Sequence, residues 1–259
     1  MLGAGCVDPT DFHRSALLIG LKEEHTTGYN PIKLGVIAST DTHVSNPGNV
    51  KESDWAGSVV GEGTPVERLQ KGILTSGIDG NPGGLAGIWA EQNTRDSIFN
   101  ALLRKEVFGT SGPRIRPRFF AGWNIDENLC NVNEMISDAY ASGVPMGGDL
   151  MPSRSKSFPK FLMHAAKDPE GLNIESIQLV KGWIDEEGNM NTKVIPVLSE
   201  IGGAESLCKV YTDTEFENSL PSYYYMRVVE PKSPRWHTYD CERLSEDDRP
   251  DVCNNETYP

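Results

Sequence analysis

Six short segments after Pro113 are predicted to be β-strands, and this succession constrains the fold more than any other feature of the chain. Among them, residues 176–180 and 223–229 alternate between apolar and polar side chains. Such alternation is typical of strands with one buried face and one solvated face. Gly, Pro, Asn and Asp residues separate the segments, as they do at turns. Six strands in so short a stretch predict an antiparallel β-sandwich-like domain. The predicted strands cover residues 114–123, 161–166, 174–184, 193–198, 207–212 and 223–229.

The residues near the start of the chain follow a different pattern. From Asp11 onward, apolar residues recur at helical spacing, with Asp11 or Thr10 as the N-cap and an end expected near Gly28. Residues 32–38 are a nearly continuous apolar run, which is typical of a parallel strand buried on both faces. A helix followed by a buried strand is half of a βα repeat, so this part is expected to be α/β.

A long stretch at 44–92 is rich in Gly, Pro, Asn and Ser and is predicted to be largely a loop, pinned by Trp55 and Trp89. A second helix is predicted at 94–108, with Asn93 as its cap. The fold class is therefore predicted as α/β plus all-β, with domains at 1–118 and 119–259, the latter ending in an acidic tail. We expect the tail from Glu242 onward to be a solvated extension.

The net charge of -13 makes nucleic acid an unfavourable partner, because so acidic a surface repels a phosphate backbone. A small anionic substrate is still compatible, since a bound metal dominates the field close to it. The apolar runs are too short to span a bilayer, so no membrane is expected as a partner. The amino terminus lacks the pattern of a signal peptide, and the sequence leaves the compartment open between cytoplasm and periplasm.

The cysteines contain no Cys-x-x-Cys pair, so the sequence gives no support for a zinc ribbon or a redox dithiol. We expect buried free thiols. The alternative is a pair between Cys241 and Cys253 in an oxidising compartment. The five cysteines are Cys6, Cys130, Cys208, Cys241 and Cys253.

Asp41 and His43 stand in Ser-Thr-Asp-Thr-His, directly after the predicted buried strand. In barrel enzymes, catalytic residues gather at the carboxyl ends of parallel strands. A carboxylate and an imidazole two residues apart can point the same way from an extended segment and bind one divalent metal. The competing interpretation is a hydrogen-bonded turn without a metal.

Longer motifs place these residues in a family resemblance. The segments 34–43, 84–95, 110–115, 119–123, 143–149, 177–183 and 234–240 resemble the family called domain of unknown function 3604. In particular, Leu34-Gly-Val-Ile-Ala-Ser-Thr-Asp-Thr-His43 resembles the last metal-binding motif of the polymerase-and-histidinol-phosphatase (PHP) superfamily. The resemblance runs from about Cys6 to Asp240.

This resemblance implies a partial PHP-like (β/α) barrel followed by the sandwich, and a hydrolase that acts on a small molecule, with a phosphoester as the expected class. Asp41 and His43 would be catalytic metal ligands for zinc, manganese or iron. Family members are longer and begin with a His-x-His pair, which this chain lacks. We therefore expect a truncated carboxyl-terminal portion that does not retain the metal by itself. A missing amino-terminal half or a second copy would complete the barrel. The alternative is a non-catalytic fragment or a β-sandwich binding module.

Other residues are weaker candidates. Arg95 and Arg114 are candidate ligands for a substrate anion, although salt bridges within the loops explain them as well. Glu91 is a candidate partner for His43. His164 and His237 are predicted to be structural, because they lie far from the motif in the sequence.

Overall fold

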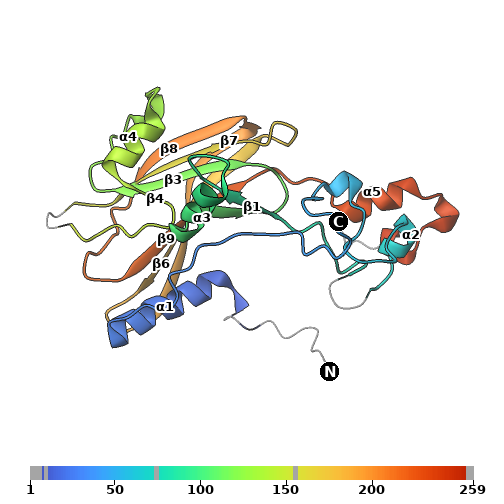
Figure 1. Ribbon diagram of the computed structural model, residues 1–259, viewed down its shortest axis with the longest axis horizontal. Helices are drawn as coiled ribbons and strands as arrows, with labels where there is room; N and C mark the ends of the chain where they lie inside the picture. The colour runs from blue at the N-terminus through green and yellow to red at the C-terminus, as the bar shows by residue number, and fades with distance from the viewer. Residues whose placement is uncertain (1–7, 9–10, 73–75, 154–156, 255–259) are drawn as a thin grey trace. The chain divides into compact units, whose positions relative to one another are not determined.

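Strands dominate the second half of the chain in the computed structural model, which describes residues 8, 11–72, 76–153 and 157–254 (Figure 1). Each of the six predicted strands is confirmed; the one predicted at 193–198 is much longer, Met190–Ala204, and the others shift by at most two residues at an end. Residue Cys6 and the alternative N-cap Thr10 lie outside the described residues. The strands are β1 (Leu85–Ile88), β2 (Val107–Thr110), β3 (Arg116–Gly122), β4 (Val144–Pro145), β5 (Lys160–Ala166), β6 (Ile174–Ile184), β7 (Met190–Ala204), β8 (Ser206–Thr212) and β9 (Ser222–Val229).

The strands form three sheets, with the orders β1-β2, β4-β3-β5-β8 and β7-β6-β9. Neighbouring strands in the two larger sheets are antiparallel throughout. Within the described residues, these sheets do not close into a barrel. The chain is therefore a mixture of helices and antiparallel sheets.

The chain forms two compact units, each built from segments that are separate in the sequence. The first, called here the sandwich unit, comprises Met1–Val36, Ile88–Val107 and Ile115–Pro231. The second, called the loop unit, comprises Ile37–Gly87, Phe108–Arg114 and Lys232–Pro259. The domain division predicted at residue 118 stays a prediction, since compactness does not test it.

The two larger sheets share the main hydrophobic core of the sandwich unit. Alternate residues of β3, β5 and β8 pack against alternate residues of β6, β7 and β9, as the alternation in the sequence requires. Phe119 and Phe161 stack at 5.8 Å, and Phe161 also contacts Tyr224 at 4.5 Å. The buried members of this core are Ile115, Phe119, Phe161, Met163, Ala165, Ile174, Ile177, Leu179, Ile195 and Leu207.

Helices cover parts of the outer faces of the sandwich unit. Helix α1 (His13–Thr27) packs Leu18 and Leu21 against Ile184 of β6. Helix α4 (Met135–Ser142) and the 3-10 turn η3 (Leu129–Asn131) cover one end of β3, β5 and β8.

The two predicted helices of the sandwich unit form. Helix α1 begins after Phe12, whose side chain makes no capping bond, so the predicted cap at Asp11 was wrong. It ends at Gly28 in the left-handed conformation, as the sequence predicts. Helix α3 (Arg95–Leu103) is capped by Thr94 and not by Asn93. It ends earlier than predicted, because the following residues form β2.

The predicted buried strand at 32–38 is wrong: the segment is not a strand and is mostly exposed. Leu34 is 60% exposed and Ile37 is 55% exposed. A strand buried on both faces needs a pairing strand on each side, and no described strand pairs with this segment.

The loop unit contains short helices joined by irregular chain, in agreement with the Gly- and Pro-rich stretch at 44–92. Helix α2 starts with a capping box, in which Thr64 and Glu67 bond to each other's backbone N–H groups. The helices and 3-10 turns of the loop unit are η2 (Glu52–Asp54), α2 (Pro65–Arg68), α5 (Trp236–Arg243), η4 (Glu246–Asp248) and η5 (Asp251–Asn254).

The acidic tail is not the solvated extension that we expected. Leu244 and Val252 pack against a buried cluster formed by Trp55, Leu69 and Trp236. The rings of Trp55 and Trp236 lie 4.5 Å apart. Trp55 does pin the loop, as predicted, and the tail contributes to the same core because its few apolar residues face inward.

Two disulfides replace the expected free thiols. Cys130 and Cys208 are bonded in the sandwich unit, and Cys241 and Cys253 are bonded in the loop unit. Only the second pair had been considered from the sequence. Within the described residues, no helix is long and apolar enough to cross a membrane.

Candidate functional site

The backbone that leads to Asp41 runs so close to two glycines that larger residues do not fit. A Cβ atom on Gly84 would lie 2.1 Å from the carbonyl oxygen of Thr110 and 2.7 Å from Cβ of Ala38. One on Gly109 would lie 3.0 Å from both N and Cβ of Ala38. Glycine is required where two backbones approach this closely. Ala38 is therefore held in place from two sides.

Hydrogen bonds fix the same segment before and after Asp41. The N–H of Gly84 donates to the Ser39 carbonyl oxygen at 2.8 Å, and the N–H of His43 donates to the Ser58 carbonyl oxygen at 2.7 Å. Between these bonds, Asp41 has a φ of 51°, in the left-handed region. Few residues with a side chain adopt that region, although Asp and Asn do so more often than most. Such backbones concentrate at functional sites.

The side chains of Asp41 and His43 are exposed and remain available to a ligand. Neither side chain has a hydrogen bond or an ion pair with any other residue that the structure describes. A carboxylate and an imidazole on one held turn are two of the groups that divalent transition metals take from proteins. The predicted candidates therefore stand on a fixed backbone with both functional groups open.

The described residues nevertheless do not fit a complete metal centre. Among them, no group of three or more His, Cys, Asp or Glu side chains is placed to hold a metal. Catalytic zinc sites generally take three protein ligands. Asp41 and His43 therefore offer part of a ligand set.

The other predicted site residues are also on the surface. Arg114 belongs to the loop unit, like Asp41 and His43, and is exposed. Arg95 opens helix α3 of the sandwich unit and is exposed; it makes no hydrogen bond or ion pair with the residues in the described ranges. Glu91 is exposed and belongs to the sandwich unit, so its predicted partnership with His43 of the loop unit stays a prediction.

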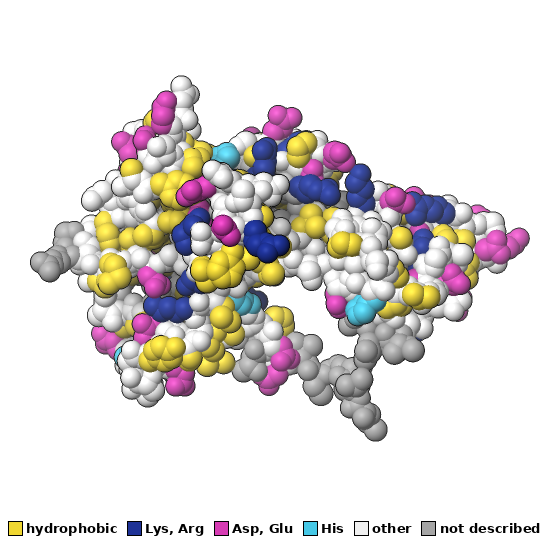
Figure 2. Space-filling view, viewed as in Figure 1, with side chains coloured by type: hydrophobic (Ala, Val, Ile, Leu, Met, Phe, Trp, Pro, Cys, Tyr) yellow, Lys and Arg dark blue, Asp and Glu magenta, His cyan; other side chains and the backbone are white. Residues whose placement is uncertain are grey.

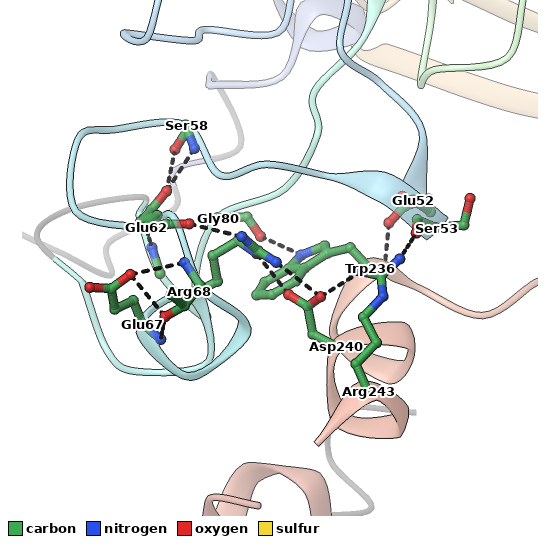
Figure 3. A network of polar contacts seen from close by, with 12 residues as sticks. Glu52, Ser53, Ser58, Glu62, Glu67, Arg68, Gly80, Trp236, Asp240 and Arg243 are labelled. Carbon is green, nitrogen blue, oxygen red and sulfur yellow. Dashed lines mark hydrogen bonds and ion pairs between the residues drawn. The ribbon is translucent and has the colours of Figure 1, made fainter. Parts of the chain in front are cut away.

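A buried network in the loop unit joins Arg68 of α2 to Asp240 of α5 (Figure 3). Arg68 donates from Nε to one carboxylate oxygen at 2.7 Å and from Nη2 to the other at 3.1 Å. Its Nη1 donates to the Glu62 carbonyl oxygen at 2.9 Å. Arg243 donates to Asp240 at 2.8 Å. This two-pronged geometry is the strong form of the arginine–carboxylate pair.

Glu62 and Trp236 extend the network (Figure 3). The buried Glu62 carboxylate accepts bonds from the N–H groups of Ser58, Val59 and Gly77. Trp236 donates from its ring to the Gly80 carbonyl oxygen at 3.1 Å, and its N–H donates to Glu52 at 2.8 Å. These charged groups already have partners within the protein, so the network supports the loop unit and offers no open ligand position. Ser58 connects it to the site, because its N–H bonds Glu62 and its carbonyl oxygen holds His43.

Comparison with models of protein families shows to which family this chain belongs. The model of a family described as protein of unknown function (DUF3604) matches residues 4–202 and 197–257. The chain belongs to the DUF3604 family. No curated protein and no solved structure matches this DUF3604 chain significantly. The Asp41–His43 turn and its two glycines lie in the first matched segment, and α5 of the buried network lies in the second.

Proposed function

We propose that this DUF3604 chain supplies one corner of a metal-dependent hydrolase, with Asp41 and His43 as ligands of a divalent ion. The observation that supports this role is the open pair of side chains on a backbone held by glycine contacts and hydrogen bonds. An ordinary surface turn does not need the close glycine approach at Gly84.

In this proposal His43 binds through a neutral imidazole nitrogen, and Asp41 binds through its carboxylate or orients a water. A divalent ion of this kind supplies an activated water and polarises an ester bond. Zinc, manganese and iron suit such ligands. The substrate class is a small phosphoester, as in PHP-like enzymes, and Arg114, of the same unit as Asp41 and His43, is the proposed contact for its negative charge.

The remaining ligands would come from a polypeptide segment outside the described residues or from a second copy of the chain. Two observations support this extension. The described part offers no group of three or more ligands. The segment before Asp41 exposes Leu34, Val36 and Ile37, which a further packed segment would cover.

The second candidate is a non-catalytic binding module, which the incomplete ligand set favours. The two proposals differ in whether the chain binds a divalent ion through Asp41.

Calorimetric titration of the full chain with Mn²⁺ or Zn²⁺ tests the hydrolase proposal. Asp41→Asn is the informative variant, because asparagine tolerates the left-handed backbone while losing the charge. Asp54→Asn is the matched control: Asp54 is an exposed aspartate of the same unit. We expect Asp41→Asn to weaken binding by about tenfold or more, which corresponds to about 1.4 kcal/mol, and Asp54→Asn to leave it unchanged.

His43→Gln should likewise weaken metal binding, and His25→Gln should leave it unchanged. His25 is a matched control because both histidines are exposed. Because the described residues offer only part of a ligand set, we expect weak but saturable binding when the metal is added in excess. Binding that is equally strong in all four variants, or no saturable binding in the unaltered chain under these conditions, would contradict the proposed corner and favour the binding module.

A further inference from the structure

The outer face of sheet β4-β3-β5-β8 arranges its side chains in four cross-strand rows. Residues directly opposite each other on neighbouring strands share a face. One row is buried beneath α4 and η3, and the other three rows carry polar and charged residues. In order along the strands, the rows are Gly122–Lys160–Thr212, the buried Phe120–Leu162–Val210, then Arg118–His164–Cys208 and Arg116–Ala166–Ser206.

The two arginines of this face have no carboxylate partner within the described part of the chain. The guanidinium of Arg118 lies 3.3 Å from the centre of the Trp89 ring and donates one bond, to the Tyr140 hydroxyl at 3.4 Å. The Arg116 side chain is exposed and makes no hydrogen bond or ion pair with any described residue. In a chain of net charge -13, two adjacent unneutralised arginines form a local positive site.

The buried carboxylate close to this face is already engaged. Glu106 accepts a hydrogen bond from the Tyr140 hydroxyl and one from Nη2 of Arg104 at 3.4 Å. The Tyr140 hydroxyl thus lies between Glu106 and Arg118, and it fixes the position of the Arg118 head group. The stacking of the Arg118 guanidinium on the Trp89 ring also holds this head group in place.

His164 faces the arginines with one ring nitrogen unsatisfied. Its Nε2 lies 3.0 Å from the Ser206 hydroxyl, whereas Nδ1 is buried and has no hydrogen-bond partner in the described structure. Burial and then the charges of Arg118 and Arg116 lower the pKa of His164, so the ring is neutral at neutral pH. A buried polar atom without a partner is uncommon in folded proteins and calls for a physical reason.

We propose that Arg116, Arg118, His164 and Ser206 form a binding site for a phosphate group. Two guanidinium groups approach from β3, and the bonded pair of Ser206 and neutral His164 on the two neighbouring strands leaves one O–H or N–H to donate. Donors from three strands suit a tetrahedral oxyanion better than a planar carboxylate. The short side chain of Ala166, between Arg116 and Ser206, leaves room at the centre of the row. This site does not depend on Asp41 or His43, which belong to the loop unit.

The test is an NMR titration of the full chain with inorganic phosphate at constant ionic strength, observed at the His164 ring. Arg116→Gln is the main variant, because Arg116 is exposed and its replacement breaks no contact within the described structure. Lys209→Gln is the matched control: Lys209 is an exposed cation of β8 that pairs with Met163 of the core-facing rows. Acetate serves as the planar anion for comparison.

We expect a saturable shift of the His164 signals with phosphate, a binding constant about tenfold weaker in Arg116→Gln, and no change in Lys209→Gln. Glycerol phosphate in a parallel titration distinguishes the source of the group: tighter binding than inorganic phosphate indicates an ester, and equal or weaker binding indicates the free ion. A shift that does not saturate, equal weakening in both variants, or acetate binding as tight as phosphate binding would overturn the proposed site.

Discussion

Arg68 and Asp240 lie 172 residues apart in the sequence and meet as a buried ion pair. Their side chains are 6% and 2% exposed, so neither charge is solvated if the other is lost. No local pattern in the sequence indicates such a pair, since helical and strand periodicities relate only near neighbours. The pairing of Lys181 with Asp213 in the sandwich unit was likewise not predictable, because a charged residue inside an apolar strand gives no indication of its partner.

Asp240→Asn should lower the free energy of unfolding by about 3–5 kcal/mol, because it leaves the Arg68 charge buried without a counter-charge. Arg243→Gln is the comparison, since Arg243 is 44% exposed where it contacts the same carboxylate. Its loss should cost about 1 kcal/mol or less. Urea denaturation of both variants measures the difference, and similar losses in the two would show that Arg68 does not depend on Asp240.

Glu230 gives the protein a specific dependence on pH. Burial, and then the Asp168 carboxylate, raise the pKa of Glu230, while Lys167 lowers it in part. One carboxylate oxygen of Glu230 is buried without a partner among the described residues. Because the pKa of Glu230 is higher in the folded chain than in the unfolded chain, ionisation of Glu230 destabilises the fold. This penalty is fully present above the folded pKa and disappears as the pH falls below the ordinary range of glutamate.

Glu230→Gln should therefore increase the free energy of unfolding at pH 7, by less than about 1 kcal/mol because the group is partly exposed. The gain should disappear near pH 3. Glu175→Gln, at an exposed position of β6, should change nothing at either pH. Denaturation curves at the two pH values provide the measurement, and a gain that persists at low pH would exclude ionisation as its cause.

At the scale of elements, the sequence predicted regular structure well where one face is buried. The six predicted strands of the β-rich half form, and alternation at 176–180 and 223–229 indicates two of them, because a half-buried strand records its two faces in the order of its residues. The short strand β4 was not predicted, since two residues are too few to show a pattern. The strand predicted from the apolar run at 32–38 was wrong, because this run does not alternate and so carries no record of two faces. A continuous run says that a strand would be buried on both sides, but not whether partners are present, and no described strand pairs with it.

The turn at Asp41–His43 was identified from its position after that run, although the strand itself does not form. Its support comes from elements that the sequence did not connect to it, namely Gly84 just before β1, Gly109 of β2 and the carbonyl oxygen of Ser58. These contacts depend on close backbone approach between distant segments, which a single sequence does not reveal.

Gly84→Ala should destabilise the loop unit by about 1–3 kcal/mol, because its new methyl group would overlap the Thr110 carbonyl oxygen and force the backbone apart. It should also weaken metal binding by displacing the turn. Gly63→Ala is the control, since its Cβ would meet only Glu67, at 3.9 Å. Denaturation and metal titration of the two variants measure these effects. A Gly84→Ala variant as stable as Gly63→Ala would contradict the expected overlap.

At the scale of the whole molecule, each compact unit has one disulfide, and charged and hydrophobic side chains are interspersed on the surface shown in Figure 2. The spacing of the cysteines did not reveal the first bond, because its two residues are 78 positions apart and meet only when β8 packs beside η3. Disulfides in general persist in oxidising compartments.

The two bonds should differ in their effect on stability. In the chain-entropy model, a loop of 78 residues corresponds to about 4.5 kcal/mol and a loop of 12 residues to about 3 kcal/mol. The double replacement of Cys130 and Cys208 by serine should therefore destabilise more than that of Cys241 and Cys253. Urea denaturation measures both, and the reverse order would show that entropy of the unfolded chain does not dominate.

The central claim is that Asp41 and His43 form an open metal corner, and paramagnetic broadening by Mn²⁺ tests it most directly. The chain has five histidines, and their ring signals can be followed separately by NMR while Mn²⁺ is added in small amounts. Our account predicts that the His43 signals broaden first and that Asp41→Asn abolishes this preference. Simultaneous broadening of all five rings, or earlier broadening of another histidine, would contradict it.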